Sequence, residues 1–245
     1  MFGRVGGKSK LKEVITNYMP EHKIYVEPFV GGGSVFFYKE PVEINIINDL
    51  DKDIYYFYRD MKDVGEKMIN RDFTGNREKF NKLKNQTKFK NNIERLYRNI
   101  YLSINSYGRK RLVYYGDKEE ERLKNSNAGK KYKTTKWKDF LNDNKVVITN
   151  KDFSKLIKKY DSKDTLFYLD PPYSKNKNAY IIDDLDPQNV FNALQNIKGK
   201  FILSYDYSPE IKKIFSKYKM IRLKTKYSIS RVDNNADVYE YLIMN

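Results

Sequence analysis

Two apolar, strand-like runs near the N-terminus constrain the fold of this chain more than any other feature. The first run covers residues 24–29 and leads into a Gly-Gly-Gly-Ser turn at 31–34, followed by the apolar residues 35–38. The second run covers 44–49, and a helical pattern begins near Asp51. We expect residues 35–38 to open a helix. The order strand, glycine turn, helix, strand, helix then predicts a βαβα unit, which needs a parallel sheet with crossover helices.

The same α/β pattern returns in the C-terminal part of the chain. Strand-like runs lie at 145–149, 165–169, 200–204 and 220–225, and helical patterns at 153–160, 186–196 and 208–218. Residues between about 60 and 140 are instead mostly helical or loop-like. We therefore predict a Rossmann-like α/β domain made of residues 1–59 and 141–245, with a mainly helical domain, 60–140, inserted between its second and third strands.

Positive charge is concentrated in the middle of the chain. The whole sequence has 48 Lys and Arg against 32 Asp and Glu, a net charge of +16. Residues 61–140 hold 22 of the basic and 10 of the acidic residues, so they carry +12. An AT-rich genome can explain a lysine-rich composition, but it explains this segregation poorly. With Tyr and Trp side chains interleaved, the region favours a nucleic-acid partner, although rings at helical spacing, such as Tyr97 and Tyr101, are expected to pack inward.

The residue types that are missing exclude several kinds of chemistry. The chain has no Cys and one His, His22. These counts exclude disulfides, thiolate zinc sites, a cysteine nucleophile and a multi-histidine metal site, and they disfavour a Ser-His-Asp triad. No apolar run approaches the roughly 18 residues of a membrane span, and the first residues do not resemble a signal peptide. We expect an intracellular protein that is neither secreted nor bound to a membrane.

The glycine turn and Asp49 together indicate a nucleotide-like ligand. A glycine turn after a strand can expose backbone N–H groups, but this one lacks both the spaced dinucleotide fingerprint and the lysine of a phosphate-binding loop. Asp49 follows the second strand, where an acid in nucleotide-binding folds accepts the ribose hydroxyls. An ordinary tight turn, and a helix N-cap at Asp49 or Asp51, remain alternatives. In combination, these features favour a small adenosine-bearing cofactor.

A second motif, Asp170-Pro171-Pro172-Tyr173, follows the apolar run 165–169. The prolines fix the backbone and remove two N–H donors, so a carboxylate, a free carbonyl and an aromatic ring are held close together. This trio suits a planar exocyclic amino group, because the acid and the carbonyl can accept its two hydrogens while the ring stacks on the base. Accepting those hydrogens also makes the nitrogen a better nucleophile.

Taken in order, the motifs resemble the Dam-type adenine-specific DNA methyltransferases, which use S-adenosylmethionine. The resemblance spans nearly the whole chain, and its matching segments are 4–8, 27–34, 48–51, 152–153, 170–173, 201–205 and 240–245. It implies cofactor binding by Arg4, Lys8, Glu27, Phe29, Gly31, Gly33, Ser34, Asp49, Asp152, Phe153 and Asp170. It also implies a catalytic motif made of Asp170, Pro171, Pro172 and Tyr173, with Tyr173 stacking on an extruded adenine.

The resemblance implies direct methyl transfer without a metal or a covalent intermediate. The absence of cysteine agrees with this, because methylation of a cytosine ring carbon requires a cysteine nucleophile. The expected partner is double-stranded DNA, bound by a monomer or a weak dimer, and a GATC-like target is implied by resemblance alone. Two alternatives stay open: methylation of a cytosine amino group or an RNA adenine, and a catalytically silent DNA-binding protein.

Arg109, Lys110 and Arg111 are the candidates for reading the target sequence. Arginine can bond the edge of a guanine through two hydrogen bonds in the major groove. The alternative is that all three side chains contact only phosphate. Further candidates for DNA contact are Asn105, Tyr107 and Lys130.

Overall fold

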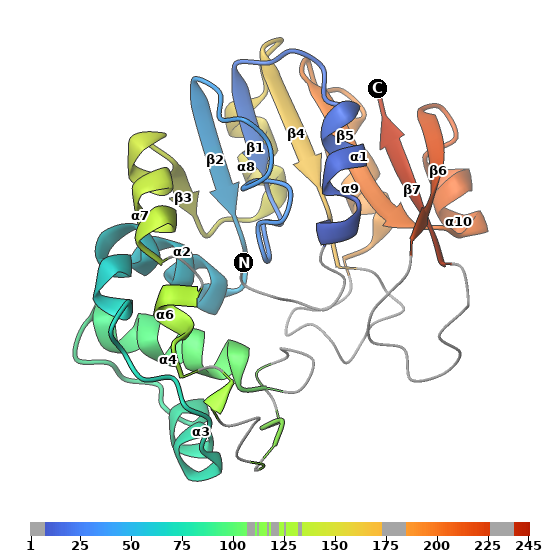
Figure 1. The fold of residues 1–245 in the computed structure, drawn as a ribbon. Coiled ribbons are helices and arrows are strands. Elements are labelled where there is room, and N and C mark those ends of the chain that lie inside the picture. The colour runs from blue at the N-terminus through green and yellow to red at the C-terminus, as the bar shows by residue number, and fades with distance from the viewer. Residues whose placement is uncertain are drawn as a thin grey trace. The chain divides into compact units, whose positions relative to one another are not determined.

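The computed structural model describes residues 8–106, 111, 113–116, 118, 123–124, 126–131, 134–172, 185–225 and 238–245 (Figure 1). These residues divide into two compact units. The sheet unit contains Lys8–Asp51 and Thr149–Asn245, and the inserted unit contains Lys52–Ile148. Residues 52–59 and 141–148, which we assigned to the sheet domain from the sequence, thus group with the inserted unit.

A seven-stranded sheet forms the centre of the sheet unit. Its strands are β1 (Ile24–Glu27), β2 (Ile44–Asn48), β3 (Val147–Thr149), β4 (Thr165–Leu169), β5 (Lys200–Asp206), β6 (Lys219–Thr225) and β7 (Val238–Met244). Their order is β3-β2-β1-β4-β5-β7-β6. β1 pairs in parallel with β2 and β4, β4 pairs in parallel with β5, and β7 runs antiparallel to β5 and β6. The predicted Rossmann-like α/β fold is confirmed.

The direction in which the strands are added reverses between β1 and β4. From β1 the chain continues to β2 on one side, whereas the later strands β4 and β5 extend the sheet on the other side. In open α/β sheets, ligands bind beside the carboxyl ends of the strands at such a switch point. In this chain, those ends are Glu27 and the residues that follow Leu169.

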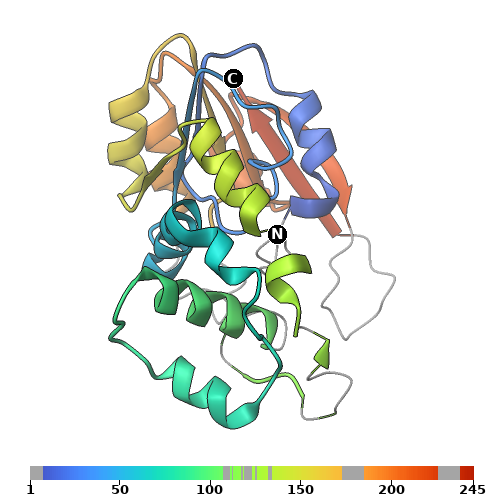
Figure 2. The ribbon, with the colours of Figure 1, turned by 60° about the vertical axis from the view of Figure 1, so that its left-hand side comes forward.

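Helices cover both faces of the sheet. They are η1 (Lys8–Lys10), α1 (Lys12–Asn17), α8 (Phe153–Tyr160), α9 (Pro187–Leu194) and α10 (Pro209–Ile214). Figure 2 shows α1 and α8 on opposite faces. The side chains of Asp152, Asp186 and Ser208 cap α8, α9 and α10 by accepting backbone N–H bonds, and a proline occupies the first turn of α9 and α10. These local preferences fix where the helices begin.

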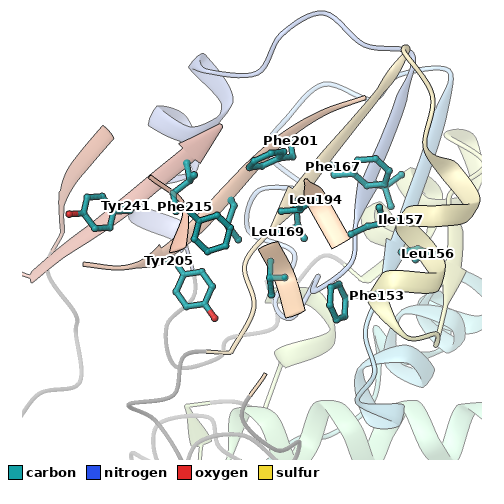
Figure 3. Close-up of a cluster of buried hydrophobic side chains, with 14 of the residues drawn as sticks. Phe153, Leu156, Ile157, Phe167, Leu169, Leu194, Phe201, Tyr205, Phe215 and Tyr241 are labelled. Carbon is teal, nitrogen blue, oxygen red and sulfur yellow. The ribbon is translucent and has the colours of Figure 1, made fainter. Parts of the chain in front are cut away.

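The core of the sheet unit lies between the sheet and the helices α8, α9 and α10. Figure 3 shows Leu156 and Ile157 of α8 beside β4, in one cluster with Phe167 and Leu169 of β4, Leu194 of α9 and Phe201 of β5. All five residues of β4 are buried. A continuous apolar run is expected of a parallel strand with both faces covered, and it explains why residues 165–169 were recognisable as a strand.

The described parts of the inserted unit are mainly helical. Its helices are α2 (Lys52–Val64), η2 (Gly65–Met68), α3 (Arg77–Lys84), α4 (Asn92–Ile104), α6 (Ala128–Lys131) and α7 (Thr134–Asp143), and α2 packs against both α4 and α7. Tyr101 of α4 is fully buried, and its hydroxyl bonds the backbone of Thr74 and Asn76. Tyr114 is also buried. At least these two rings of the basic region therefore serve the core.

One predicted helix does not form. Residues 31–38 make a series of turns, with Phe37 N–H donating to Gly33 and Lys39 N–H donating to Val35. The prediction of a helix over 35–38 was wrong, because this short β-branched and aromatic segment has weak helix propensity and Pro41 disfavours helical backbone just beyond it. Of the helices in the described ranges, none has the length and apolar character to cross a membrane.

Candidate active site

Lys8 joins two acidic side chains in the sheet unit. Its ammonium lies 2.8 Å from Asp170 Oδ1 and 3.4 Å from Glu240 Oε2. Lys8 and Glu240 are almost completely buried, and Asp170 is 21 % exposed. Asp170 directly follows β4, and Glu240 lies in the middle of β7. The cluster therefore holds the Asp170 carboxylate at the switch point through a short ion pair with Lys8.

Glu27 supplies a further acid at the carboxyl end of β1. It is 2 % exposed, and its Oε2 accepts a 2.7 Å hydrogen bond from the Tyr25 hydroxyl. Burial has the largest effect on the pKa of Glu27, and together with the charges of Asp170 and Asp49 it raises this pKa to about 8, against the lowering effects of the Tyr25 bond and Lys39. Burial also lowers the pKa of Lys39 to about 8. Glu27 is therefore largely neutral at pH 7 and gains its charge near pH 8.

The glycine turn after β1 is tied to the end of β2. Gly31 and Gly33 have positive φ values of 48° and 66°, a conformation that favours glycine. Asp49 Oδ2 accepts the Gly31 N–H at 2.9 Å, and Asp49 Oδ1 accepts the Asp51 N–H at 3.0 Å. Asp49 thus fixes the turn as well as standing at the position proposed for a ribose contact.

Asn48 connects the glycine turn to the segment before α8. Its amide donates to the carbonyls of Pro28 and Lys151, both at 2.9 Å, and its carbonyl accepts the Lys151 N–H. This buried side chain therefore holds the start of the glycine turn beside the 149–151 segment, which leads directly into the cap of α8.

Asp152 and Phe153 both have structural partners. Asp152 caps α8 by accepting the N–H groups of Ser154 and Lys155. Burial is the largest single influence on the pKa of Asp152 and raises it, but the Ser154 hydroxyl bond, the two N–H bonds and the charge of Lys155 together lower this pKa below its usual value. The Phe153 ring is nearly buried in the core and lies 5.4 Å from the Phe29 ring. Their assignment to the cofactor stays a prediction.

The remaining cofactor and catalytic candidates are only partly described. Ser34 and Pro171 are buried, and Pro172 is partly exposed. Arg4 and Tyr173 lie outside the described residues. The described part of the motif therefore consists of an aspartate paired with Lys8 and two prolines that follow a fully buried strand.

The candidate DNA-binding residues belong to the inserted unit. Asn105 is fully buried, and its amide donates to the Phe73 carbonyl at 3.1 Å. The Arg111 guanidinium bonds Asp53 at 3.1 Å, whereas Lys130 is exposed on α6. The candidates Tyr107, Arg109 and Lys110 lie outside the described residues.

Sequence reasoning missed three residues that organise these clusters. Glu240, the second partner of Lys8, is a single acid inside the otherwise uncharged β7 strand, which was a usable signal. Tyr25 is the partner of Glu27, and it was hidden in an apolar strand. Asp53 lies in the first turn of α2, where an acidic side chain is common because it interacts favourably with the helix dipole, so its sequence position gave no signal.

The site suits a cationic ligand with a nucleoside part. Glu27 ends β1, while Asp49 and Asp170 directly follow the neighbouring strands β2 and β4. The three acids lie close enough that Asp49 and Asp170 both raise the pKa of Glu27. S-adenosylmethionine carries a sulfonium and an ammonium group, so an acidic edge beside a glycine turn fits it. No group of three or more acidic or histidine side chains suited to a metal ion occurs within the described ranges.

Comparison with known proteins places this site in a family. Residues 5–229 match the model of the D12 class N6 adenine-specific DNA methyltransferases. A type II methyltransferase of Lactococcus lactis subsp. cremoris, M1.LlaDCHI, is 27% identical, with 98% of this chain and 93% of the relative covered. A type II methyltransferase of Methanocaldococcus jannaschii, M.MjaIII, is 26% identical over 98% of this chain and 96% of the relative. A DNA adenine methylase of Vibrio cholerae is 27% identical over 69% of this chain and 63% of its own length. A match over nearly the whole length, on a sheet with this switch point, means that the chain belongs to the D12 class of N6 adenine-specific DNA methyltransferases.

Proposed function

We propose that this adenine-specific DNA methyltransferase modifies the exocyclic amino group of an adenine flipped out of a short duplex site, with Asp170 at the reacting nitrogen. The observation that carries the proposal is the position of Asp170. It stands at the switch point directly after β4, is followed by two prolines, and is paired with the buried Lys8 at 2.8 Å. The family match extends over this motif.

The acidic edge is proposed to hold S-adenosylmethionine, which supplies the methyl group when bound. Glu27 and Asp170 would face its positive charges, and Asp49 would accept the ribose hydroxyls. Lys8, Phe29, Gly31, Gly33, Ser34, Asp152 and Phe153 complete the proposed set, together with Arg4. The burial of Glu27 supports this role. Burial disfavours the charged form of this carboxyl group, and a bound cation would stabilise that charged form.

Asp170 and Pro171 are proposed to bind the adenine amino group. The Asp170 carboxylate and the Pro171 carbonyl accept its two hydrogens, so its lone pair stays on the nitrogen and the nitrogen becomes more nucleophilic. Pro172 keeps the turn rigid, and Tyr173 stacks on the flipped base. Positioning of the nitrogen then supplies most of the rate enhancement.

The inserted unit is proposed to bind the DNA. Most of the surplus positive charge lies in residues 61–140, which supports contact with the phosphate backbone. Arg109 and Lys110 remain candidates for base reading. Two relatives are named type II methyltransferases, which supports action at a short defined sequence. A GATC-like target is proposed by resemblance alone, and the enzyme is proposed to act as a monomer or a weak dimer.

Modified-base sequencing of DNA from a methylation-free host tests the proposal. Cells expressing the wild-type chain should carry N6-methyladenine at one short sequence context, and cells expressing Asp170→Ala should carry none. In vitro, we expect Asp170→Ala to lower methylation by at least about 10³-fold, while DNA affinity changes little.

Two outcomes would overturn the proposal. Methylation that survives in Asp170→Ala would remove Asp170 from the reacting centre. Modification of the cytosine amino group, or of RNA adenine alone, would move the substrate to one of the alternatives. Cofactor titration of both proteins by calorimetry separates a lost reaction from a lost cofactor site.

A further inference from the structure

Two arginines converge on one aspartate in the inserted unit. Asp53 lies in the first turn of α2, and both of its carboxylate oxygens accept bonds of 3.0 Å from Arg98 of α4. Its Oδ2 also accepts a 3.1 Å bond from Arg111. The side chains of Arg98 and Arg111 are only 11 % and 9 % exposed, whereas that of Asp53 is 35 % exposed. Both guanidinium groups are therefore held largely inside the unit.

Arg98 is a fixed part of the helix packing. Its guanidinium donates to the Leu83 carbonyl at 3.1 Å near the end of α3, and to the Asn99 side chain at 3.0 Å. The Asn99 amide in turn donates to the backbone carbonyl of Asp53 at 3.2 Å. Helices α2, α3 and α4 thus determine the position of the Asp53 carboxylate before Arg111 is considered.

Arg111 is held within the segment between Ser106 and Tyr114. Ser106 and Tyr114 form an antiparallel bridge, and the Tyr115 N–H donates to the Asn105 carbonyl at 3.2 Å, so the two ends of the segment lie side by side. The Arg111 N–H donates to Ser106 Oγ at 2.9 Å, and its φ of 60° is unfavourable for a residue with a side chain. A disfavoured backbone conformation persists where surrounding bonds determine it.

We propose that Asp53, aligned by Arg98, anchors Arg111 beside Ser106 and that this anchor is needed for tight DNA binding, so that Arg111 is a positioning residue and does not read DNA. This inference rests on the proposed DNA-binding role of the inserted unit. It revises the sequence-based hypothesis that Arg111 contacts a base or a phosphate. Arg109 and Lys110, which precede Arg111 in the sequence, stay the candidates for contact with DNA.

The bonds around Asp53 favour an anchor over a DNA contact. A base-reading arginine needs its guanidinium edge free to approach a base, whereas the Arg111 side chain is 9 % exposed and bonded to a carboxylate. The negative charge of Asp53 also offsets part of the positive charge of Arg111, which would otherwise attract a phosphate group. Asp53 would therefore weaken a contact between Arg111 and phosphate, whereas it stabilises Arg111 in its buried position.

The opposite effects expected for one substitution give a direct test. Asp53→Asn removes the negative charge with almost no change of shape. If Asp53 anchors Arg111, the KM for duplex DNA should rise about tenfold with little change in kcat, and Arg111→Ala should give the same result. The double variant should be no worse than either single variant. The slope of log Kd for DNA against log salt concentration should stay at the wild-type value in Arg111→Ala.

Asp63→Asn is the matched control, because Asp63 is an exposed acid on the same helix α2. It makes the same change of charge without touching Arg111, so its KM for DNA should stay unchanged or fall slightly. Calorimetric cofactor binding should stay near the wild-type value for every variant, and so should the thermal midpoint of Asp63→Asn. The thermal midpoints of Asp53→Asn and Arg111→Ala should fall, because each change breaks a largely buried ion pair. If Arg111→Ala does not fold, Asp53→Asn alone retains the distinction through the direction of its effect.

Two results would overturn the anchor. One is a fall of about one in the salt slope of Arg111→Ala, which is the sign of a lost phosphate contact. The other is stronger DNA binding by Asp53→Asn, equal to that of Asp63→Asn. Failure of the proposed function would look different, because the wild-type chain itself would then leave duplex DNA unmethylated.

Discussion

Each of the two units contains a cluster of three charged side chains, and the two clusters have opposite charge patterns. In the sheet unit, Lys8 is shared by two carboxylates, Asp170 and Glu240, with Glu27 and Asp49 close by. In the inserted unit, Asp53 is shared by two arginines. The first cluster has an excess of acid beside the switch point and fits a cationic ligand. The second has an excess of base, but its cations are bonded internally, so positive charge in a region proposed to bind DNA does not by itself identify a DNA contact.

Removal of the shared ion should affect the two clusters unequally. Lys8→Ala leaves two largely buried carboxylates without their cation, so we expect the free energy of unfolding to fall by about 3–5 kcal/mol and methylation to be lost. Denaturant unfolding measures the first effect, and a methyl-transfer assay measures the second.

Arg98→Ala is the comparison in the inserted unit, where it removes one of the two partners of the shared Asp53. Asp53 is one-third exposed and keeps Arg111 as a partner, so the loss of stability should be smaller, although Arg98 also bonds the end of α3. Equal losses of stability in Lys8→Ala and Arg98→Ala would show that burial does not distinguish the clusters.

The acid cluster should make cofactor binding depend on pH. Because the pKa of Glu27 is raised to about 8, this carboxyl is mostly neutral at pH 7 and becomes negative as pH rises through 8. A cationic cofactor should therefore bind more tightly with rising pH, by at most about tenfold per pH unit for one proton, and binding at pH 7 should release a proton. Calorimetry in buffers of different ionisation enthalpy measures both quantities.

Glu27→Gln isolates this effect from that of Lys39, which loses its charge in the same pH range and changes affinity in the same direction. The variant should bind the cofactor more weakly at pH 8.5 and show a shallower pH dependence. An unchanged pH profile would assign the titration to Lys39.

Substitutions in the glycine turn should have the smallest effect on the free energy of unfolding. Gly31 has a φ of 48°, and a Cβ placed there meets no atom within 4 Å, so Gly31→Ala should cost only the strain of its backbone, about 1–2 kcal/mol of unfolding free energy. Gly31→Asn should cost less, because asparagine tolerates this conformation. Because Gly31 belongs to the proposed cofactor set, a side chain in this open space should also weaken cofactor binding. Unchanged cofactor affinity would mean that the ligand does not occupy the space beside Gly31.

Features that depend on near neighbours were predictable from the sequence. The bounds of β4 and α8 match the prediction, because a continuous apolar run and an Asp cap are local signals. The helix expected at 35–38 does not form, and the reason is also local. The apolar pattern is present, but the residues themselves and the nearby Pro41 favour turns.

The partners of the charged residues were not predictable in this way. Lys8 and Asp170 were both predicted site residues, yet nothing in their sequence neighbourhoods shows that they bond each other or share Glu240. Arg111 was predicted to contact DNA because it belongs to the basic run 109–111. The sequence alone does not distinguish an arginine that binds DNA from one that pairs within the protein. Its bond to Asp53, 58 residues away, depends on how α2 and α4 pack.

The sequence alone thus determined the α/β class, the order of its motifs and the chemistry that those motifs can perform, because strand burial, capping and proline geometry act over a few residues. The tertiary structure decided which charges face each other. Ion pairs form between side chains that the strand order and the helix packing bring together, so the same lysines and arginines can serve a ligand, a nucleic acid or the protein itself.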